Sequence, residues 1–276
     1  IPQTSTIGSH LPRAVGMALA IERARKLGVP CTYPQDALVV CSFGDASANH
    51  STAAGAINTA CHCAHQHLPL PLLFVCEDNG LGISVRTPSG WIAAAYGSRP
   101  GLRYFEADGL DLADAFEVAS RAAEYVRESR RPAFLRMSVV RLMGHAGTDL
   151  ETAYRRTEEI ERDLQRDPLV QSARLLVEGG VLTPQGVLAR YEQKRAEIRE
   201  AALWAETRPP LRTAAEVMEP LAVRRPERVA VEAARAASAE ARKAFFESKL
   251  PEAQGPLTLA LSINSTGAVS ANPPTF

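Results

Sequence analysis

The sequence predicts an α/β protein with a doubly wound, mostly parallel sheet. Short apolar runs typical of buried strands recur along the chain, separated by segments whose apolar residues have helical spacing. Strand and helix alternating in this way are typical of a parallel sheet covered by helices on both faces. In addition, polar runs containing glycine follow two of the predicted strands directly, at the edge where open α/β sheets bind ligands.

Four apolar runs are predicted strands: Ala37–Phe43, Leu72–Val75, Arg103–Ala107 and Ala133–Val140. Residues that break regular structure mark their ends. Pro69 and Pro71 precede the second run, and Asp108-Gly109 turns the chain after the third. The fourth run leads directly into a glycine-rich loop around His145. Uninterrupted apolar runs are typical of parallel strands buried on both faces.

Helices are predicted between and beyond these strands. Leu11–Lys26 is apolar at helical spacing and has Pro12 at a tolerated first-turn position. Ser51–His65 is rich in small residues and is expected to pack close to the sheet, while Leu112–Val126 shows one amphipathic face. A last helix is expected from Pro184 to about Thr207, with Thr183 as its N-cap.

Composition argues against several classes of partner. The chain has 276 residues, and 31 lysines and arginines balance 31 aspartates and glutamates, so no net field attracts nucleic acid or an anionic membrane. No apolar run reaches the roughly 18–20 residues of a membrane span. The five cysteines are odd in number, and four fall between Cys41 and Cys76. This pattern disfavours a disulfide framework and predicts a cytoplasmic protein.

Two short polar runs carry the clearest chemical pattern. The run Gly44–Asn49 follows the first strand, and the run Glu77–Gly82 follows the second, with room for one helix between Asp45 and Asn79. A carboxylate and a carboxamide should therefore lie side by side at the carboxyl edge of the sheet. Such oxygen ligands suit Mg²⁺, which takes its remaining ligands from phosphate and water. Backbone N–H groups at the start of the next helix would add an anion site.

Other interpretations of the same residues remain open. Asp45 alone would most often be a helix N-cap, and Asn79 could simply tolerate a left-handed turn. Cys61-His62-Cys63-Ala64-His65 suggests zinc, but on a helix only Cys61 and His65 share a face, which gives two ligands where a structural site needs four. Gly80-Leu81-Gly82 lacks the third glycine of a dinucleotide fingerprint.

Taken together, the two polar runs resemble the thiamine diphosphate signature, Gly-Asp-Gly followed by Asn-Asn, although Ala46 replaces a glycine. Arg141-Leu-Met-Gly-His145-Ala-Gly-Thr-Asp149, then Tyr154-Arg155 and Asp167-Pro168, is similar to a stretch of the α subunit of 2-oxo acid dehydrogenases. The opening segment Ser5–Gly16 matches that family's loop and helix under the thiamine rings. The likeness runs from about Ile1 to Thr207, and fused α–β forms are the most similar.

The resemblance implies a role for each matching residue. Mg²⁺ would be held by Asp45, Asn79 and the Leu81 carbonyl, and the diphosphate by main-chain groups of Ala46 and Ser47. Ser5 and Ile7 would contact the aminopyrimidine ring. His145 would hold the distal phosphate and lie near the path of acyl transfer. The resemblance implies a catalytic role for His145 and Arg141, with Arg141 as the electrostatic partner of His145, although Arg141 could instead be a solvated charge.

The resemblance also implies a function: the α-type portion of an oligomeric thiamine diphosphate-dependent enzyme that decarboxylates a 2-oxo acid and passes the acyl group to lipoyl. Its partners would be a β-type chain or domain and a lipoyl-bearing acyltransferase, and it would be inactive without the β part. An apolar surface at Leu11–Met17 and Ile83–Trp91 is expected to face that partner. The alternatives are a catalytically silent fragment that acts in assembly and a non-oxidative thiamine diphosphate-dependent decarboxylase.

Three regions are expected. Residues 1–207 would form the cofactor-binding domain without its N-terminal part, and residues 208–256 a helical linker containing several prolines. Within the linker, Val229–Leu250 is predicted to be helical. Residues 257–276 would be a stub of a β-type domain or a tail without a fold of its own.

Overall fold

The computed structural model describes residues 6–28 and 31–219, and six single positions beyond them, Glu227, Ala230, Val231, Glu240, Lys243 and Ala244. The strands are β1 (Val39–Gly44), β2 (Leu72–Asp78), β3 (Arg103–Asp108) and β4 (Ala133–Ser138). The helices are α1 (His10–Leu27), α2 (Ser51–His65), α3 (Trp91–Tyr96), α4 (Leu112–Ser129), α5 (Thr157–Gln165), α6 (Pro168–Glu178), α7 (Pro184–Glu206) and α8 (Ala214–Met218), and the 3-10 turns are η1 (Ala46–Asn49) and η2 (Glu151–Ala153). The first seven helices and the sheet fall in one unit and α8 in a second, apart from the last residues of α1.

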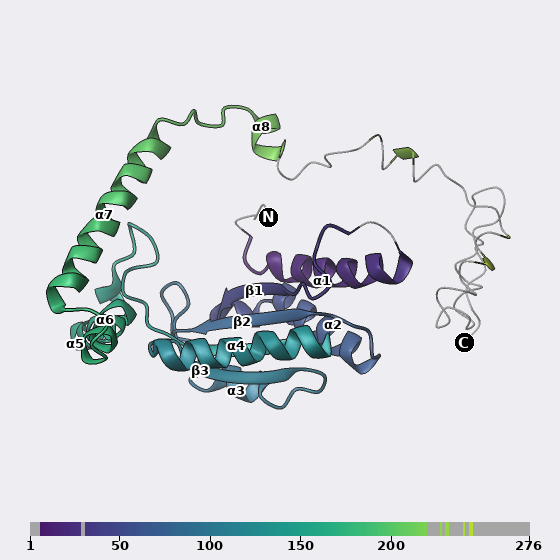
Figure 1. Ribbon diagram of the computed structural model, residues 1–276, viewed down its shortest axis with the longest axis horizontal. Coiled ribbons are helices and arrows are strands. Elements are labelled where there is room, and N and C mark those ends of the chain that lie inside the picture. The colour runs from purple at the N-terminus through teal and green to yellow at the C-terminus, as the bar shows by residue number, and fades with distance from the viewer. Residues whose placement is uncertain are drawn as a thin grey trace. The chain divides into compact units, whose positions relative to one another are not determined.

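The four described strands form one parallel sheet in the order β1-β2-β4-β3. Figure 1 labels β1, β2 and β3 of this sheet. The β1 and β2 strands are aligned so that Gly44 pairs with Glu77, and β2 and β4 so that Asp78 pairs with Ser138. The carboxyl ends of these three neighbouring strands therefore lie level. The chain returns from β3 to β4 in the opposite direction to its step from β1 to β2, which is why the connecting helices lie on opposite faces.

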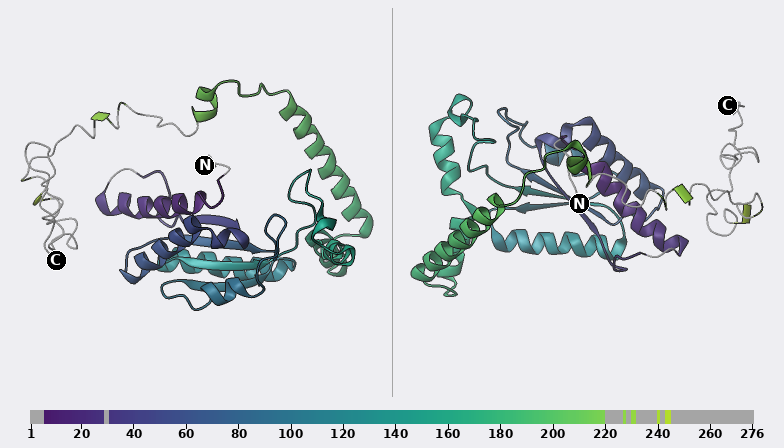
Figure 2. Two further views of the ribbon diagram at one scale, coloured as in Figure 1. Left: turned by 180° about the vertical axis from the view of Figure 1, so that it is seen from behind. Right: turned by 90° about the horizontal axis from the view of Figure 1, so that it is seen from above.

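Two hydrophobic cores confirm that helices cover both faces of the sheet. On one face, residues of α1, α2 and α3 pack with Phe43, Phe74 and Phe134. On the other, Val118, Ala122 and Val126 of α4 pack with Leu73, Leu135 and their neighbours. Figure 2 shows α4 on one side of the sheet and α1 and α2 on the other. The predicted α/β fold with a doubly wound parallel sheet is therefore confirmed.

Capping residues close to the helix ends in sequence mark where several of the helices begin. Ser51–His65 was predicted as a helix and has these bounds, and Thr183 accepts a hydrogen bond from the Gly186 N–H as the N-cap of α7. Asp111, whose carboxylate accepts from Ala113 and Asp114, caps α4. The second strand was predicted too short: β2 continues to Asp78, because Glu77 and Asp78 still pair with β4.

Several expectations concern residues that the structure does not describe. Ser5 and the tail 257–276 lie outside the described residues, and so does most of the predicted linker helix Val229–Leu250. Within the described part of the linker, a capping box at Thr213 and Glu216 starts the short helix α8. Among the described residues, no helix is long and apolar enough to cross a membrane.

Candidate functional site

Three loops leave the carboxyl ends of three adjacent strands and meet there. The η1 turn follows β1, the loop from Asn79 to Gly90 follows β2, and the loop from Val139 to Leu150 follows β4. Hydrogen bonds link neighbouring strand ends, from Asp45 N to Glu77 O (3.3 Å) and from Val139 N to Asp78 O (3.0 Å). The three sequence motifs are thus brought to one edge of the sheet, where open α/β folds bind ligands.

Asp45 is a buried carboxylate with one oxygen that lacks a partner. Its residue surface is 2% exposed, and Oδ1 has no hydrogen bond among the described residues. The other oxygen, Oδ2, accepts from the Thr87 hydroxyl. Burial raises the pKa of Asp45, and the hydrogen bond from the Thr87 hydroxyl opposes that shift. Asp45 stands at the N-cap position of η1, but its side chain makes no capping bond there, so capping does not account for its buried carboxylate.

Asn79 and Leu81 form a tight turn beside this carboxylate. The Asn79 Oδ1 accepts from the Leu81 N–H at 2.9 Å, and Gly80 between them has φ +72°, which favours glycine. Leu81 and Arg86 are a non-hydrogen-bonded antiparallel pair, because the bonds join their neighbours. The Leu81 carbonyl therefore points outside this short ladder.

The backbone anion site differs from the prediction. We expected the motif to open the next long helix, but residues 46–49 form their own 3-10 turn, and α2 begins at Ser51 with His50 as its N-cap. The N–H groups at the start of η1, those of Ala46 and Ser47, lie where a helical turn offers no internal acceptor. The Ala46 methyl group lies next to Gly82, because a Cβ atom at position 82 would be 3.7 Å from it.

These residues fit a magnesium–diphosphate group. An ionised carboxylate is costly to bury unless it is hydrogen-bonded, paired or metal-bound, and Asp45 Oδ1 is buried without a partner among the described residues. The Asn79 carboxamide oxygen keeps a second lone pair beside its bond to Leu81. Among the described residues, no three histidine, cysteine or acidic side chains cluster to form a metal site. This is compatible with Mg²⁺, which is commonly held by one or two carboxylates together with substrate phosphates and water.

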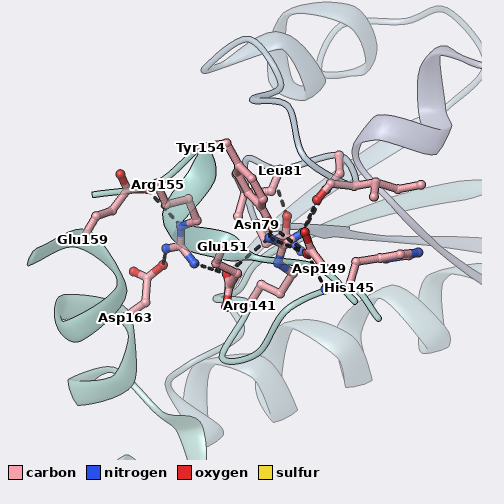
Figure 3. Close-up of polar contacts among 12 residues, drawn as sticks. Asn79, Leu81, Arg141, His145, Asp149, Glu151, Tyr154, Arg155, Glu159 and Asp163 are labelled. Atoms are coloured by element: carbon pink, nitrogen blue, oxygen red, sulfur yellow. Dashed lines mark hydrogen bonds and ion pairs between the residues drawn. The ribbon is translucent and has the colours of Figure 1, made fainter. Parts of the chain in front are cut away.

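Arg141 is the link between the His145 loop and the Leu81 loop. Its Nη1 donates to the carbonyls of Gly82 (3.0 Å) and Ile83 (2.8 Å), and its Nη2 donates to the Tyr154 hydroxyl. Acidic neighbours lie at 3.3 Å (Glu151) and 3.8 Å (Asp149) (Figure 3). The side chain is 14% exposed, so Arg141 is not a solvated charge. It positions two loops.

His145 lies in an exposed loop whose backbone is tied down. Its N–H donates to Asp149 Oδ2 at 2.7 Å, while its ring extends away from Arg141 (Figure 3). The bond from the His145 N–H and one from the Tyr154 hydroxyl lower the pKa of Asp149. Gly144 is required here, because a Cβ would lie 2.8 Å from the Asp149 carbonyl oxygen. The ring is left accessible for a ligand.

Sequence reasoning missed a buried cation next to this loop. Arg155 is 4% exposed and contacts three carboxylates, with Nη1 2.8 Å from Glu151, Nε 3.4 Å from Glu159, and a further bond to Asp163. Glu159 also pairs with Arg86 of the Leu81 loop. The signal was present in the charge pattern, since acidic residues stand four before and four and eight after the arginine.

The prediction of an exposed apolar surface is wrong for its first stretch, Leu11–Met17. Leu11 and Val15 are 0% and 5% exposed because the apolar side of α1 packs into the core. The second expected stretch is exposed: Ile83 is 56%, Val85 67% and Trp91 44% accessible. Ile7 is also exposed.

Other clusters lie apart from the three motif loops. One cavity of about 490 Å³ is lined by residues of the β3–α4 connection and α6, including Asp108, Arg166 and Arg174. A second, of about 420 Å³, lies beside Cys61, His65 and Arg99. The five cysteines are all unpaired, and burial raises the pKa of Cys41 to about 11.

Comparison with known proteins identifies the family of the chain. The family model of the dehydrogenase E1 component matches residues 1–214. A testis-specific pyruvate dehydrogenase E1 component subunit alpha of Homo sapiens is 29% identical over 209 residues, which cover 74% of this chain and 49% of the relative. Subunits alpha of Caenorhabditis elegans and Rickettsia conorii are 28% and 27% identical, with 71% and 74% of this chain and 46% and 59% of the relative covered.

The chain spans about half the length of the curated relatives it matches. Within that span the match extends from the first residue through α7, and it includes all three loops at the carboxyl edge of the sheet. The chain therefore belongs to the dehydrogenase E1 component family.

Proposed function

We propose that the chain is the α-type portion of a thiamine diphosphate-dependent 2-oxo acid dehydrogenase. The observation that carries this proposal is the partnerless, buried Oδ1 of Asp45 at the edge where three motif loops meet. A group that brings a divalent cation and a diphosphate to this edge would satisfy it. The relatives, named as pyruvate dehydrogenase E1 subunits alpha, support the same reaction class.

In this proposal Asp45, Asn79 and the Leu81 carbonyl hold Mg²⁺. Main-chain groups of Ala46 and Ser47 bind the diphosphate, and Ser5 and Ile7 contact the aminopyrimidine ring. When bound, thiamine diphosphate supplies the electron sink for decarboxylation. This chain then binds and orients the cofactor at the carboxyl edge of the sheet.

The exposed apolar residues Ile83, Val85 and Trp91 support a partner surface. We propose that a β-type chain or domain covers it and that a lipoyl-bearing acyltransferase accepts the acyl group. Residues 1–207 would act as the cofactor-binding domain, residues 208–256 as a linker, and residues 257–276 as a β-type stub or tail. The unpaired cysteines support a reducing compartment such as the cytoplasm.

Reconstitution tests the function. We expect the chain alone to show no turnover, and the chain with a β-type partner to associate in light scattering and to oxidise a 2-oxo acid with an artificial electron acceptor. Association without turnover would favour the catalytically silent assembly role. Carbon dioxide release with free aldehyde and no acceptor would favour the non-oxidative decarboxylase. No association would contradict the proposed partner surface.

His145→Ala tests the role of the exposed ring. In the assembled enzyme the variant should bind cofactor more weakly, because a charge-assisted bond to phosphate is worth roughly 1.5–3 kcal/mol. We expect acyl transfer to lipoyl to fall more than decarboxylation followed with the artificial acceptor. Met143→Ala, which changes another exposed side chain of the same loop, is the control. Wild-type cofactor affinity and lipoyl acylation in His145→Ala would show that the assigned role is wrong.

A further inference from the structure

The 3-10 turn η1 is separate from the helix that follows it, although Ala48 of η1 packs in the same core as residues of α2. His50, which separates η1 from α2, has extended backbone (φ −67°, ψ 136°) and caps α2. A four-residue 3-10 turn makes few internal hydrogen bonds. On its strand side, Asp45 N reaches Glu77 O only at 3.3 Å. Beyond this packing, side chains from another part of the chain form hydrogen bonds to η1 and to the motif carboxylate.

One segment, Thr87–Tyr96, supplies these side chains, and we call it the brace. Its three hydrogen bonds to residues 45–49 are Thr87 Oγ1 to Asp45 Oδ2, Trp91 Nε1 to Asn49 Oδ1 (2.6 Å) and Tyr96 OH to the Ala48 carbonyl (3.1 Å). The last of these is buried, where a hydrogen bond is worth most. The brace therefore binds both the Asp45 carboxylate and the η1 turn that follows it.

The brace is itself fixed to the core. Tyr96 is 4% exposed and stacks on Phe134 with ring centroids 4.7 Å apart and planes 15° from parallel. Ile92, 3% exposed, packs in the same core. Gly90 starts α3 with φ +74°, a conformation that favours glycine. An element anchored in this way can determine where the shorter turn lies.

The first residue of the brace, Thr87, also contacts the loop that carries Asn79 and Leu81. The Thr87 N–H donates to the Gly80 carbonyl at 3.0 Å, which closes the loop that carries Leu81. Thr87 therefore binds the Leu81 loop through its backbone and Asp45 through its hydroxyl. By occupying Oδ2, the hydroxyl holds the carboxylate in the orientation that leaves Oδ1 without a protein partner.

We propose that the brace sets the spacing between Asp45 and the Leu81 carbonyl, and that Thr87 is a positioning residue that directs Asp45 Oδ1 toward the cation. This inference rests on the proposed function and adds a residue that no motif contains. Thr87 acts through Asp45 and does not itself touch the cofactor. Two substitutions separate the roles of the Thr87 hydroxyl and methyl group. Serine keeps the hydroxyl without the methyl group, and valine keeps the methyl group without the hydroxyl.

The experiment compares Thr87→Val with Thr87→Ser, with the chain alone and with its β-type partner. We expect Thr87→Val to raise the Mg²⁺-dependent dissociation constant of thiamine diphosphate by roughly tenfold or more, as loss of a hydrogen bond to a charged group should. Thr87→Ser should stay close to wild type. Tyr104→Phe is the control, since it removes a hydroxyl–carboxylate bond (3.1 Å, to Glu106) outside the site.

Hydrogen exchange of the peptide covering residues 45–50 gives a readout without cofactor. It should be faster in Thr87→Val than in wild type, Thr87→Ser or Tyr104→Phe. Equal binding by wild type and Thr87→Val would overturn the positioning role alone, and so would equal losses in Thr87→Val and Thr87→Ser. A wild-type chain that binds no cofactor, alone or with its partner, would overturn the proposed function and the inference together.

Discussion

Replacing Arg155 with alanine is expected to lower the free energy of unfolding by about 3–5 kcal/mol, the usual cost of removing one partner from a buried ion pair. The reason is that Glu151, Glu159 and Asp163 would keep their charges without the cation that they share. Because these carboxylates hold α5 against the His145 and Leu81 loops, both loops should also exchange amide hydrogens faster. Urea unfolding followed by circular dichroism measures the change.

Arg86→Ala is the matched control for this prediction. Arg86 also pairs with Glu159, but its side chain is 59% exposed, so its loss should cost no more than about 1 kcal/mol. Arg86 and Arg155 lower the pKa of Glu159, so the stability from these pairs is present above the unfolded pKa of glutamate and is lost as the pH falls. Equal costs for the two variants would contradict the buried-cation account.

Asp45→Asn is expected to abolish measurable Mg²⁺-dependent binding of thiamine diphosphate while leaving the fold intact. Asparagine has the same shape but no charge for a hard cation. The free chain should be at least as stable as wild type, since burial raises the pKa of Asp45 and its charge is therefore unfavourable in the absence of a cation. Isothermal titration calorimetry and urea unfolding measure the two effects separately.

Glu77→Gln is the control, because Glu77 is an exposed carboxylate at the end of the neighbouring strand. It removes one charge from the same edge of the sheet and should leave cofactor binding close to wild type. An Asp45→Asn chain that binds cofactor as wild type does would remove Asp45 from the metal site. A Glu77→Gln chain that loses binding would point to the general field of the edge and not to one ligand.

The sequence predicts the sheet, its helices and the meeting of the motif loops because these follow from local patterns. Apolar runs mark strands, and parallel strands bring their carboxyl ends together. The helix Ser51–His65 is predicted at both ends from its run of small residues, and the structure adds that His50 caps it. The family motifs place Asp45, Asn79, Arg141 and His145 at the same edge.

Long-range contacts could not be predicted in this way. Leu11 and Val15 were expected on a partner surface, but the choice of which side of α1 faces the sheet depends on packing that the pattern does not fix. The bonds from Arg141 to Gly82 and Ile83 join residues 59 and 58 positions apart, and the Thr87 hydroxyl reaches Asp45 across 42 positions. Such pairs have no sequence period.

Thermal unfolding with and without ligands tests most directly the proposal that Asp45, Asn79 and the Leu81 carbonyl bind thiamine diphosphate through Mg²⁺. Thiamine diphosphate and Mg²⁺ together should raise the unfolding midpoint, with a stabilisation of about 2.7 kcal/mol at a hundredfold excess over the dissociation constant, and neither should do so alone. EDTA should remove the shift. An equal rise with EDTA present would contradict the assignment of Asp45, Asn79 and Leu81 to a metal.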